Sequence, residues 1–100
     1  MQNFRTYDLA VDFYRRCEQV RMPSYLRTQL LRAASSVALN LAEGSSRPRG
    51  RDRLRLYVIA LGSLRECQAV LDLNPGIGGL VPVADRLGAS LFRLCYPRSG

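Results

Sequence analysis

Histidine and lysine are both absent from this sequence of 100 residues, and cysteine occurs only three times. Without histidine, the chain lacks the commonest general base and the commonest metal ligand. Cys17, Cys67 and Cys95 lie far apart and form no C-x-x-C pair, so we expect no zinc site, no other metal and no cofactor. Each cysteine lies among apolar residues with helical spacing, which predicts three small buried side chains.

Long apolar runs, internal repeats and strand patterns are also missing. The longest apolar stretches are far shorter than a membrane span, so we expect no membrane partner. An odd number of cysteines without a signal-peptide pattern is typical of a reducing compartment, which predicts a cytoplasmic protein. Since no composition shift marks a domain boundary, we expect a single domain over residues 1–100.

Negative charge is scarce. Eight acidic residues stand against 15 basic residues, all of them arginine, which gives a net charge of +7 and a pI near 10.2. Such a balance favours an anionic partner, such as nucleic acid, an acidic protein or a membrane surface. Arginine grips phosphate with two hydrogen bonds and stacks on bases, which suits RNA, but the codons of a GC-rich genome favour arginine as well.

Apolar residues recur with the spacing of a helix in four segments, which turn residues separate. The expected helices span residues 6–20, 24–43, 52–73 and 82–96. Gly44 is the expected C-cap of the second helix, and Pro82 is the expected first residue of the fourth. The residues expected to face the core from the third helix are Leu54, Val58, Leu61, Leu64 and Leu71. This pattern predicts an all-α, antiparallel up-down-up-down four-helix bundle.

The second helix is unusually apolar, because only three side chains between residues 33 and 42 are polar. A helix that is apolar on most sides is buried on most sides. A chain of this length buries only a modest core by itself. We therefore expect a second subunit to cover part of this helix, and the protein to be a homo-oligomer.

A stripe of polar side chains nevertheless follows one face of the second helix, at spacings of three and four residues. The stripe consists of Gln29, Arg32, Ser36, Asn40 and Glu43, and the third helix carries Arg55, Ser63 and Glu66 at compatible spacing. In an antiparallel hairpin, Arg32 would meet Glu66, Glu43 would meet Arg55, and Ser36 would meet Ser63. Buried charges need such partners, so we predict a structural polar network. Because the stripe offers no nucleophile beside a base, we expect no enzyme.

Five arginines occupy every second position from 47 to 55, between the second and third helices. Pro48 and Gly50 favour a turn, and helical geometry begins near residue 51, so the five side chains do not form one row. Arg55 is expected to turn inward, which leaves as candidate nucleic-acid-binding residues Arg47, Arg49, Arg51 and Arg53. Two interpretations stay open: a solvated basic turn, or a patch that contacts phosphates. No aromatic residue lies close by in the sequence to stack on a base.

Two stretches, QLLRAASSVALNLAEGSSR at 29–47 and RLYVIALGSLRE at 55–66, resemble a known family. It is the four-helix-bundle family of proteins encoded in intervening sequences of bacterial 23S ribosomal RNA genes, and it includes relatives of the accessory variability protein of diversity-generating retroelements. The similarity rests on the patterns Q-x-x-R-A-A-x-S-x-x-x-N-x-A-E-G and A-x-G-S-L-x-E. Family members often have aromatic residues where Ser45 and Arg53 stand here, and a serine in place of Arg49. The hairpin tip of this chain is therefore more basic than is usual.

The resemblance implies a homopentameric ring of antiparallel bundles with a basic surface and no known enzymatic activity. In the retroelement branch of the family, the bundle binds the reverse transcriptase and nucleic acid. Two hypotheses follow for this chain. The first is a non-enzymatic, oligomeric accessory protein that binds the RNA or DNA backbone. The second is a protein–protein adaptor that holds a reverse transcriptase, without any affinity of its own for nucleic acid.

Overall fold

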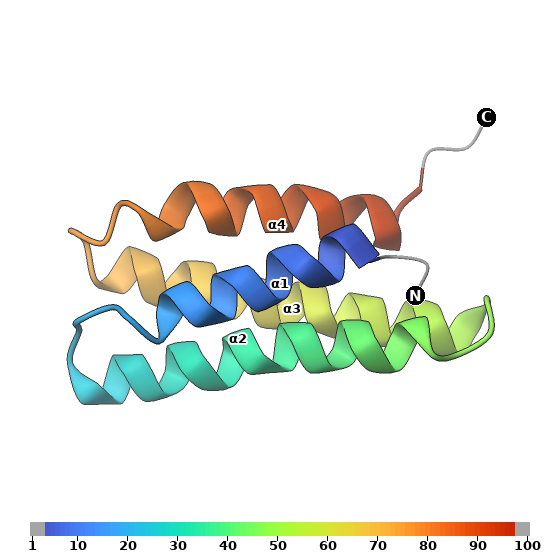
Figure 1. Cartoon of the computed structure of the whole chain (residues 1–100), viewed down its shortest axis with the longest axis horizontal. Coiled ribbons are helices and arrows are strands. Elements are labelled where there is room, and N and C mark those ends of the chain that lie inside the picture. Colours follow the sequence, from blue (N-terminus) through green and yellow to red (C-terminus); the bar gives the residue numbers. More distant parts are fainter. Residues whose placement is uncertain (1–3, 98–100) are drawn as a thin grey trace.

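The computed structural model describes residues 4–97, and most of this range is helical. The four helices are α1 (Phe4–Cys17), α2 (Ser24–Ser45), α3 (Arg51–Leu73) and α4 (Leu80–Cys95). Each helix packs against the next in sequence, and α1 also packs against α4, which closes the bundle (Figure 1). The predicted all-α up-down arrangement is confirmed. Because of this arrangement, the α2–α3 turn and the C-terminal end of α4 lie at the same end of the molecule.

Most helix boundaries differ from the sequence-based expectation by one to three residues, and two of these differences have a clear physical reason. The first helix ends at Cys17, because Gln19 and Val20 donate their backbone N–H groups three residues back, in a tighter turn. The fourth helix starts at Leu80, two residues before Pro82. Proline is tolerated there because the N–H groups of a first helical turn have no acceptor within the helix.

The core lies between the four helices and is built from one face of each. Its fully buried large side chains are Phe13, Leu30, Val37, Leu41, Leu64, Leu87 and Leu91. The three cysteines are buried and free, as predicted. One polar contact crosses this region between α1 and α4, where the hydroxyl groups of Thr6 and Ser90 lie 2.6 Å apart.

The prediction of which residues of α3 face the core is wrong for the N-terminal half of the helix. Leu54 is 44% exposed and Val58 is 41% exposed. The buried side chains of this half are instead Leu56, Tyr57 and Ala60, whereas the predicted Leu61, Leu64 and Leu71 are buried. Residues 54 and 58 lie on a row beside the buried one, and apolar spacing alone does not decide which of two neighbouring rows faces the core.

Close contact between α2 and α3 near the tip of their hairpin explains Gly44. This glycine is not the predicted left-handed C-cap, because α2 continues through it to Ser45 and Ser46 forms the cap. A Cβ atom at position 44 would lie 2.7 Å from Cε1 and 2.9 Å from Cδ1 of Tyr57. The ring of Tyr57 therefore packs directly on the backbone of α2, and its hydroxyl oxygen lies 3.1 Å from Oγ of Ser45.

Replacing Gly44 with alanine is expected to destabilise the protein by about 1–3 kcal/mol, because the new methyl group overlaps the buried ring of Tyr57. Urea denaturation monitored by circular dichroism measures the change. Gly62→Ala is the matched control, since Gly62 also lies inside a helix but has no atom within 4 Å of the added Cβ. The control should leave the free energy of unfolding unchanged or raise it by up to about 1 kcal/mol. Equal midpoints for the two variants would contradict the close contact.

Candidate nucleic-acid interface at the hairpin tip

The centre of the predicted polar stripe joins α2 to α3. Oγ of Ser36 lies 2.8 Å from Oγ of Ser63. The side-chain amide of Asn40 donates to the carbonyl oxygen of Ser36 at 2.9 Å and to its hydroxyl oxygen at 3.1 Å. The predicted register, with Ser36 opposite Ser63, is confirmed.

The charged ends of the stripe do not pair across the hairpin as predicted. Within residues 4–97, no ion pair joins Arg32 to Glu66 or Glu43 to Arg55. Nη2 of Arg32 instead donates to Oε1 of Gln29 at 2.6 Å, and Oε1 of Glu43 accepts from Arg47 at 3.2 Å. The four predicted partners are all exposed. Since water already solvates these charges, no desolvation penalty forces them to find a partner on the other helix.

Arg53 makes the main polar contacts of the tip. Its Nε donates to the carbonyl oxygens of Gly44 at 3.2 Å and Arg47 at 3.0 Å, and its Nη2 donates to those of Ser45 at 3.3 Å and Arg47 at 2.6 Å. These carbonyl groups belong to the C-terminal end of α2 and the residues just after it, where a helix leaves its acceptors unsatisfied and carries partial negative charge. Arg53 therefore ties the start of α3 to the end of α2. The inward-turned arginine is Arg53, whereas the predicted Arg55 is exposed.

The other candidate arginines are exposed. Arg47 forms its ion pair with Glu43 one turn earlier on the chain, at the surface. Arg49 and Arg51 have no ion pair within the described residues and extend from the turn and from the first residue of α3. An exposed guanidinium without a carboxylate partner keeps its full charge for an external anion.

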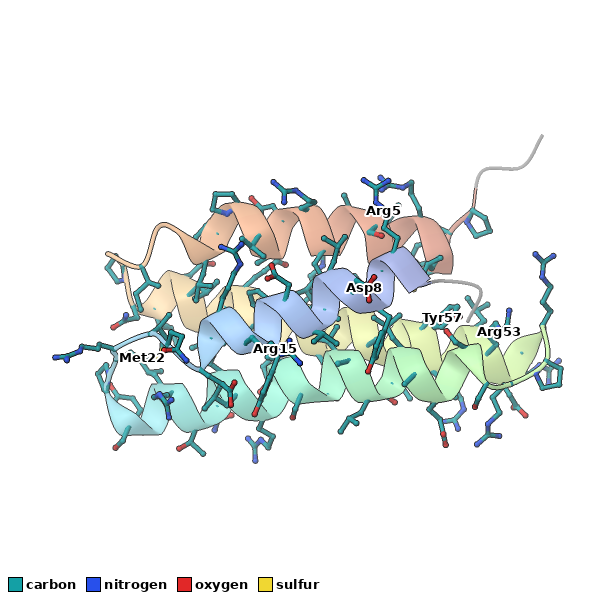
Figure 2. The ribbon with its side chains drawn as sticks, viewed as in Figure 1. Arg5, Asp8, Arg15, Met22, Arg53 and Tyr57 are labelled. Atoms are coloured by element: carbon teal, nitrogen blue, oxygen red, sulfur yellow. The ribbon has the colours of Figure 1, made fainter. Side chains whose placement is uncertain are left out.

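A further arginine, which the sequence analysis missed, joins this end of the bundle. Arg93, in the last turn of α4, lines a surface hollow of about 380 Å³ together with Arg49 and Arg53. The apolar part of this hollow comes from Leu54, Tyr57 and Leu94. Figure 2 shows Arg53 and Tyr57 at this end and Met22 at the opposite one. The predicted antiparallel topology could have revealed Arg93, because it brings the end of the fourth helix to the turn between the second and third helices.

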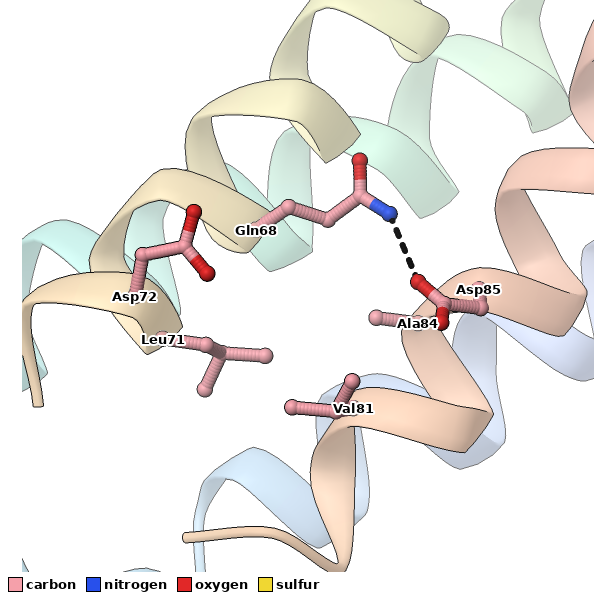
Figure 3. A pocket seen from close by; sticks show the side chains of 6 residues that line it. All are labelled: Gln68, Leu71, Asp72, Val81, Ala84 and Asp85. Atoms are coloured by element: carbon pink, nitrogen blue, oxygen red, sulfur yellow. Dashed lines mark hydrogen bonds between the residues drawn. The ribbon is translucent and has the colours of Figure 1, made fainter. Parts of the chain in front are cut away.

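The groove between α3 and α4 is lined by acidic side chains away from the tip. Near the α3–α4 connection it forms a pocket of about 280 Å³, lined by the carboxylates of Asp72 and Asp85 (Figure 3). The amide of Gln68 donates to Oδ1 of Asp85 at 3.1 Å. Carboxylates repel phosphate, so an anionic ligand of this surface would be confined to the basic end.

The described residues were also considered as a reactive cysteine site, a metal site and a membrane span. Burial raises the pKa of Cys17 and of Cys67 to about 12, and it also raises the pKa of Cys95. Such thiols stay protonated at neutral pH and are poor nucleophiles. Between residues 4 and 97, no cluster of three or more cysteine, aspartate or glutamate side chains is placed to hold a metal ion. None of the four described helices combines the length and apolar character that a membrane span requires.

Four antiparallel helices and arginines gathered at one end define a small, basic four-helix-bundle protein. The model of the family described as 23S rRNA-intervening sequence protein matches residues 4–80. This match covers most of the chain, and the chain belongs to that family. The description of the family names no reaction. Comparisons with curated proteins and with solved structures gave no match.

Arg53→Ala is expected to destabilise the fold by about 1–3 kcal/mol, because several carbonyl groups at the end of α2 lose a charged donor. Arg51→Ala is the matched control: it removes the same charge two residues away, from a side chain that makes no such bond, and should change stability by less than about 0.5 kcal/mol. Urea denaturation of both variants measures the difference. If the two variants unfold at the same urea concentration, Arg53 does not tie α3 to α2.

Proposed function

We propose that this protein is a non-enzymatic, oligomeric accessory protein that binds RNA or DNA through the phosphate backbone. The observation that carries the proposal is the convergence of exposed arginines from separate parts of the chain at one end of the bundle. Arg49 comes from the turn, Arg51 from the start of α3 and Arg93 from the end of α4. This gathering favours the phosphate-contacting interpretation over that of a merely basic turn.

The proposed contacts are electrostatic. Each arginine that neutralises a phosphate releases condensed counterions, so affinity depends on salt and hardly on sequence. The N-terminus of α3 adds little to this charge, because the exposed carboxylate of Asp52 in its first turn offsets the partial positive charge of the helix end. Arg47 and Arg53, which the sequence analysis also nominated, have smaller roles in this proposal. Arg47 shares its charge with Glu43, and Arg53 maintains the shape of the tip.

RNA is the preferred ligand in this proposal because of the family to which the chain belongs, whose description refers to an intervening sequence of 23S ribosomal RNA. The arginine-only composition agrees with this choice, since a guanidinium both pairs with phosphate and stacks on bases.

Assembly into a homopentamer is the second part of the proposal. It is supported by the apolar stretch of α2, of which a single chain buries only one side. Leu39 is 68% exposed, and Ala38 and Ala42 are only partly buried. Contact between copies would cover these side chains and present several arginine tips to one nucleic acid, which multiplies a weak individual affinity.

Removing the tip charges should weaken binding to unrelated RNAs about equally. The test variant is Arg49→Gln with Arg51→Gln and Arg93→Gln, because none of these side chains holds the fold together. Fluorescence anisotropy with a labelled 20-nucleotide RNA at several salt concentrations gives the affinity and its salt dependence. About three lost phosphate contacts should flatten the slope of log affinity against log salt by roughly 2 units.

The control removes three exposed arginines elsewhere: Arg15→Gln, Arg21→Gln and Arg86→Gln. It should retain most of the affinity. Equal losses in the two triple variants would mean that binding follows net charge and that the tip is only a basic turn. If the wild-type protein binds neither RNA nor DNA at low salt, the proposal fails. The adaptor hypothesis, with a retroelement reverse transcriptase as partner, then takes its place.

The wild-type protein at micromolar concentration is expected to elute as a homo-oligomer, with a mass near five times that of the 11.2 kDa chain. Size-exclusion chromatography with light scattering measures this mass. Leu39→Asp should lower it, because the new carboxylate would be buried unpaired between copies. A wild-type mass near 11.2 kDa would contradict the oligomeric part of the proposal.

A further inference from the structure

Two exposed aromatic side chains stand beside the basic tip, one turn apart at the end of α4. Phe92 is 49% exposed and Tyr96 is 56% exposed. Their ring centroids lie 4.8 Å apart, with an angle of 46° between the ring planes. Neither ring belongs to the core, so the fold of a single chain gives no reason for placing them together at the surface.

Arg93 connects this aromatic pair to the tip. It lines the tip hollow with Arg49 and Arg53, and it also lines a second hollow, of about 440 Å³, beside Phe92. Arg93 is thus a lining residue that the two hollows share. Arg65 of α3 also lines the second hollow. The ring of Phe92 therefore shares a hollow with guanidinium groups from both helices, and Tyr96 packs beside Phe92.

Gly88, one turn before Phe92, is buried where α4 packs closely on α3. A Cβ atom on Gly88 would lie 3.3 Å from Cδ2 of Leu64 and 3.5 Å from Nη1 of Arg65, so side chains of α3 fill the place of its missing side chain. The ring of Phe92 itself stays about half exposed at the surface beside this contact, where a flat group can approach it.

We propose that Phe92 and Tyr96 form a stacking platform for the bases of a single-stranded nucleic acid, whose phosphates are held by Arg93 and Arg49. This inference rests on the proposed function and specifies its ligand. Every base has a π-face that stacks on an aromatic ring, so the platform tolerates any sequence. It also supplies exposed rings at this end of the bundle, where the ring of Tyr57 is buried against α2.

Single strands are favoured over duplexes for a geometric reason. In a duplex the base faces are covered by neighbouring bases, and only the base edges and the phosphates are accessible to a protein surface. A duplex would therefore gain only the arginine contacts. The strand is expected to end its path in the second hollow, because Asp85 lines that hollow together with Phe92, and Asp72 and Asp85 both line the neighbouring pocket.

The test compares the wild-type protein with the double variant Phe92→Leu and Tyr96→Leu, which keeps an apolar side chain at both positions but loses both rings. The probes are a labelled 12-nucleotide oligouridylate and a labelled 16-base-pair RNA duplex, measured by anisotropy at one low salt concentration. We expect the variant to lose roughly 5- to 100-fold in affinity for the single strand, the range typical of one stacked base. Its affinity for the duplex should change less than about twofold, and its salt slope should match that of the wild type, because no charge is removed.

The matched control is Tyr25→Leu, which removes an exposed aromatic ring from the start of α2, at the other end of the bundle. It should bind both probes like the wild type. If the double variant binds the single strand as well as the wild type does, the platform is refuted while the proposed function stands. Equal losses for the single strand and the duplex also refute it. A fall in mass by light scattering would mean that the rings contact another copy of the chain, which overturns the inference. A wild-type protein that binds neither probe removes the proposed function itself.

Discussion

The close approach of α3 to α2 at Gly44 sets the geometry on which the rest of the tip depends. An aromatic ring packed on a bare stretch of helix backbone allows only one distance and one rotation between the two helices. Tyr57 holds this position, and its hydroxyl group lies within hydrogen-bond distance of the last residue of α2. One turn earlier on α3, Arg53 reaches the carbonyl groups at the end of α2. The packing of Tyr57 on Gly44 and the hydrogen bonds of Arg53 therefore both hold the start of α3 against the end of α2. The connecting turn lies between these two helix ends.

Charge along the bundle is distributed unevenly, and this follows from topology more than from local sequence. An antiparallel four-helix arrangement returns the end of α4 to the start of α3, so arginines separated by some forty residues become neighbours. The carboxylates of the α3–α4 groove lie toward the other end. The groove between α3 and α4 is therefore basic near the tip and acidic near the α3–α4 connection, so the two ends of this groove would act on an anion in opposite ways.

Much of the scaffold could be predicted from the sequence, because helix spacing and hairpin register depend on neighbours along the chain. The four helices and the pairing of Ser36 with Ser63 are of this kind. The cross-helix ion pairs failed because their side chains are solvated, and periodicity does not report how much water reaches a charge. The role of Gly44 and the nearness of Arg93 could not be predicted, since each depends on a contact between separate helices. The role of the arginine run in binding stays a prediction, and the run did not reveal that Arg53 serves the fold.

The carbonyl contacts of Arg53 have a consequence for the length of the turn. Inserting one residue into the first turn of α3, between Arg51 and Arg53, would rotate Arg53 and the rest of the helix by about 100° relative to the residues before it. The guanidinium would then point away from its acceptors, and the ring of Tyr57 would leave the gap above Gly44. The side chains of Pro48 and Arg49 make no comparable contact with α2 and can be exchanged without this rotation. The number of residues that lead to Arg53 is thus constrained by its contacts, and the residue at position 50 is constrained as well, because the φ angle of Gly50 is +138°.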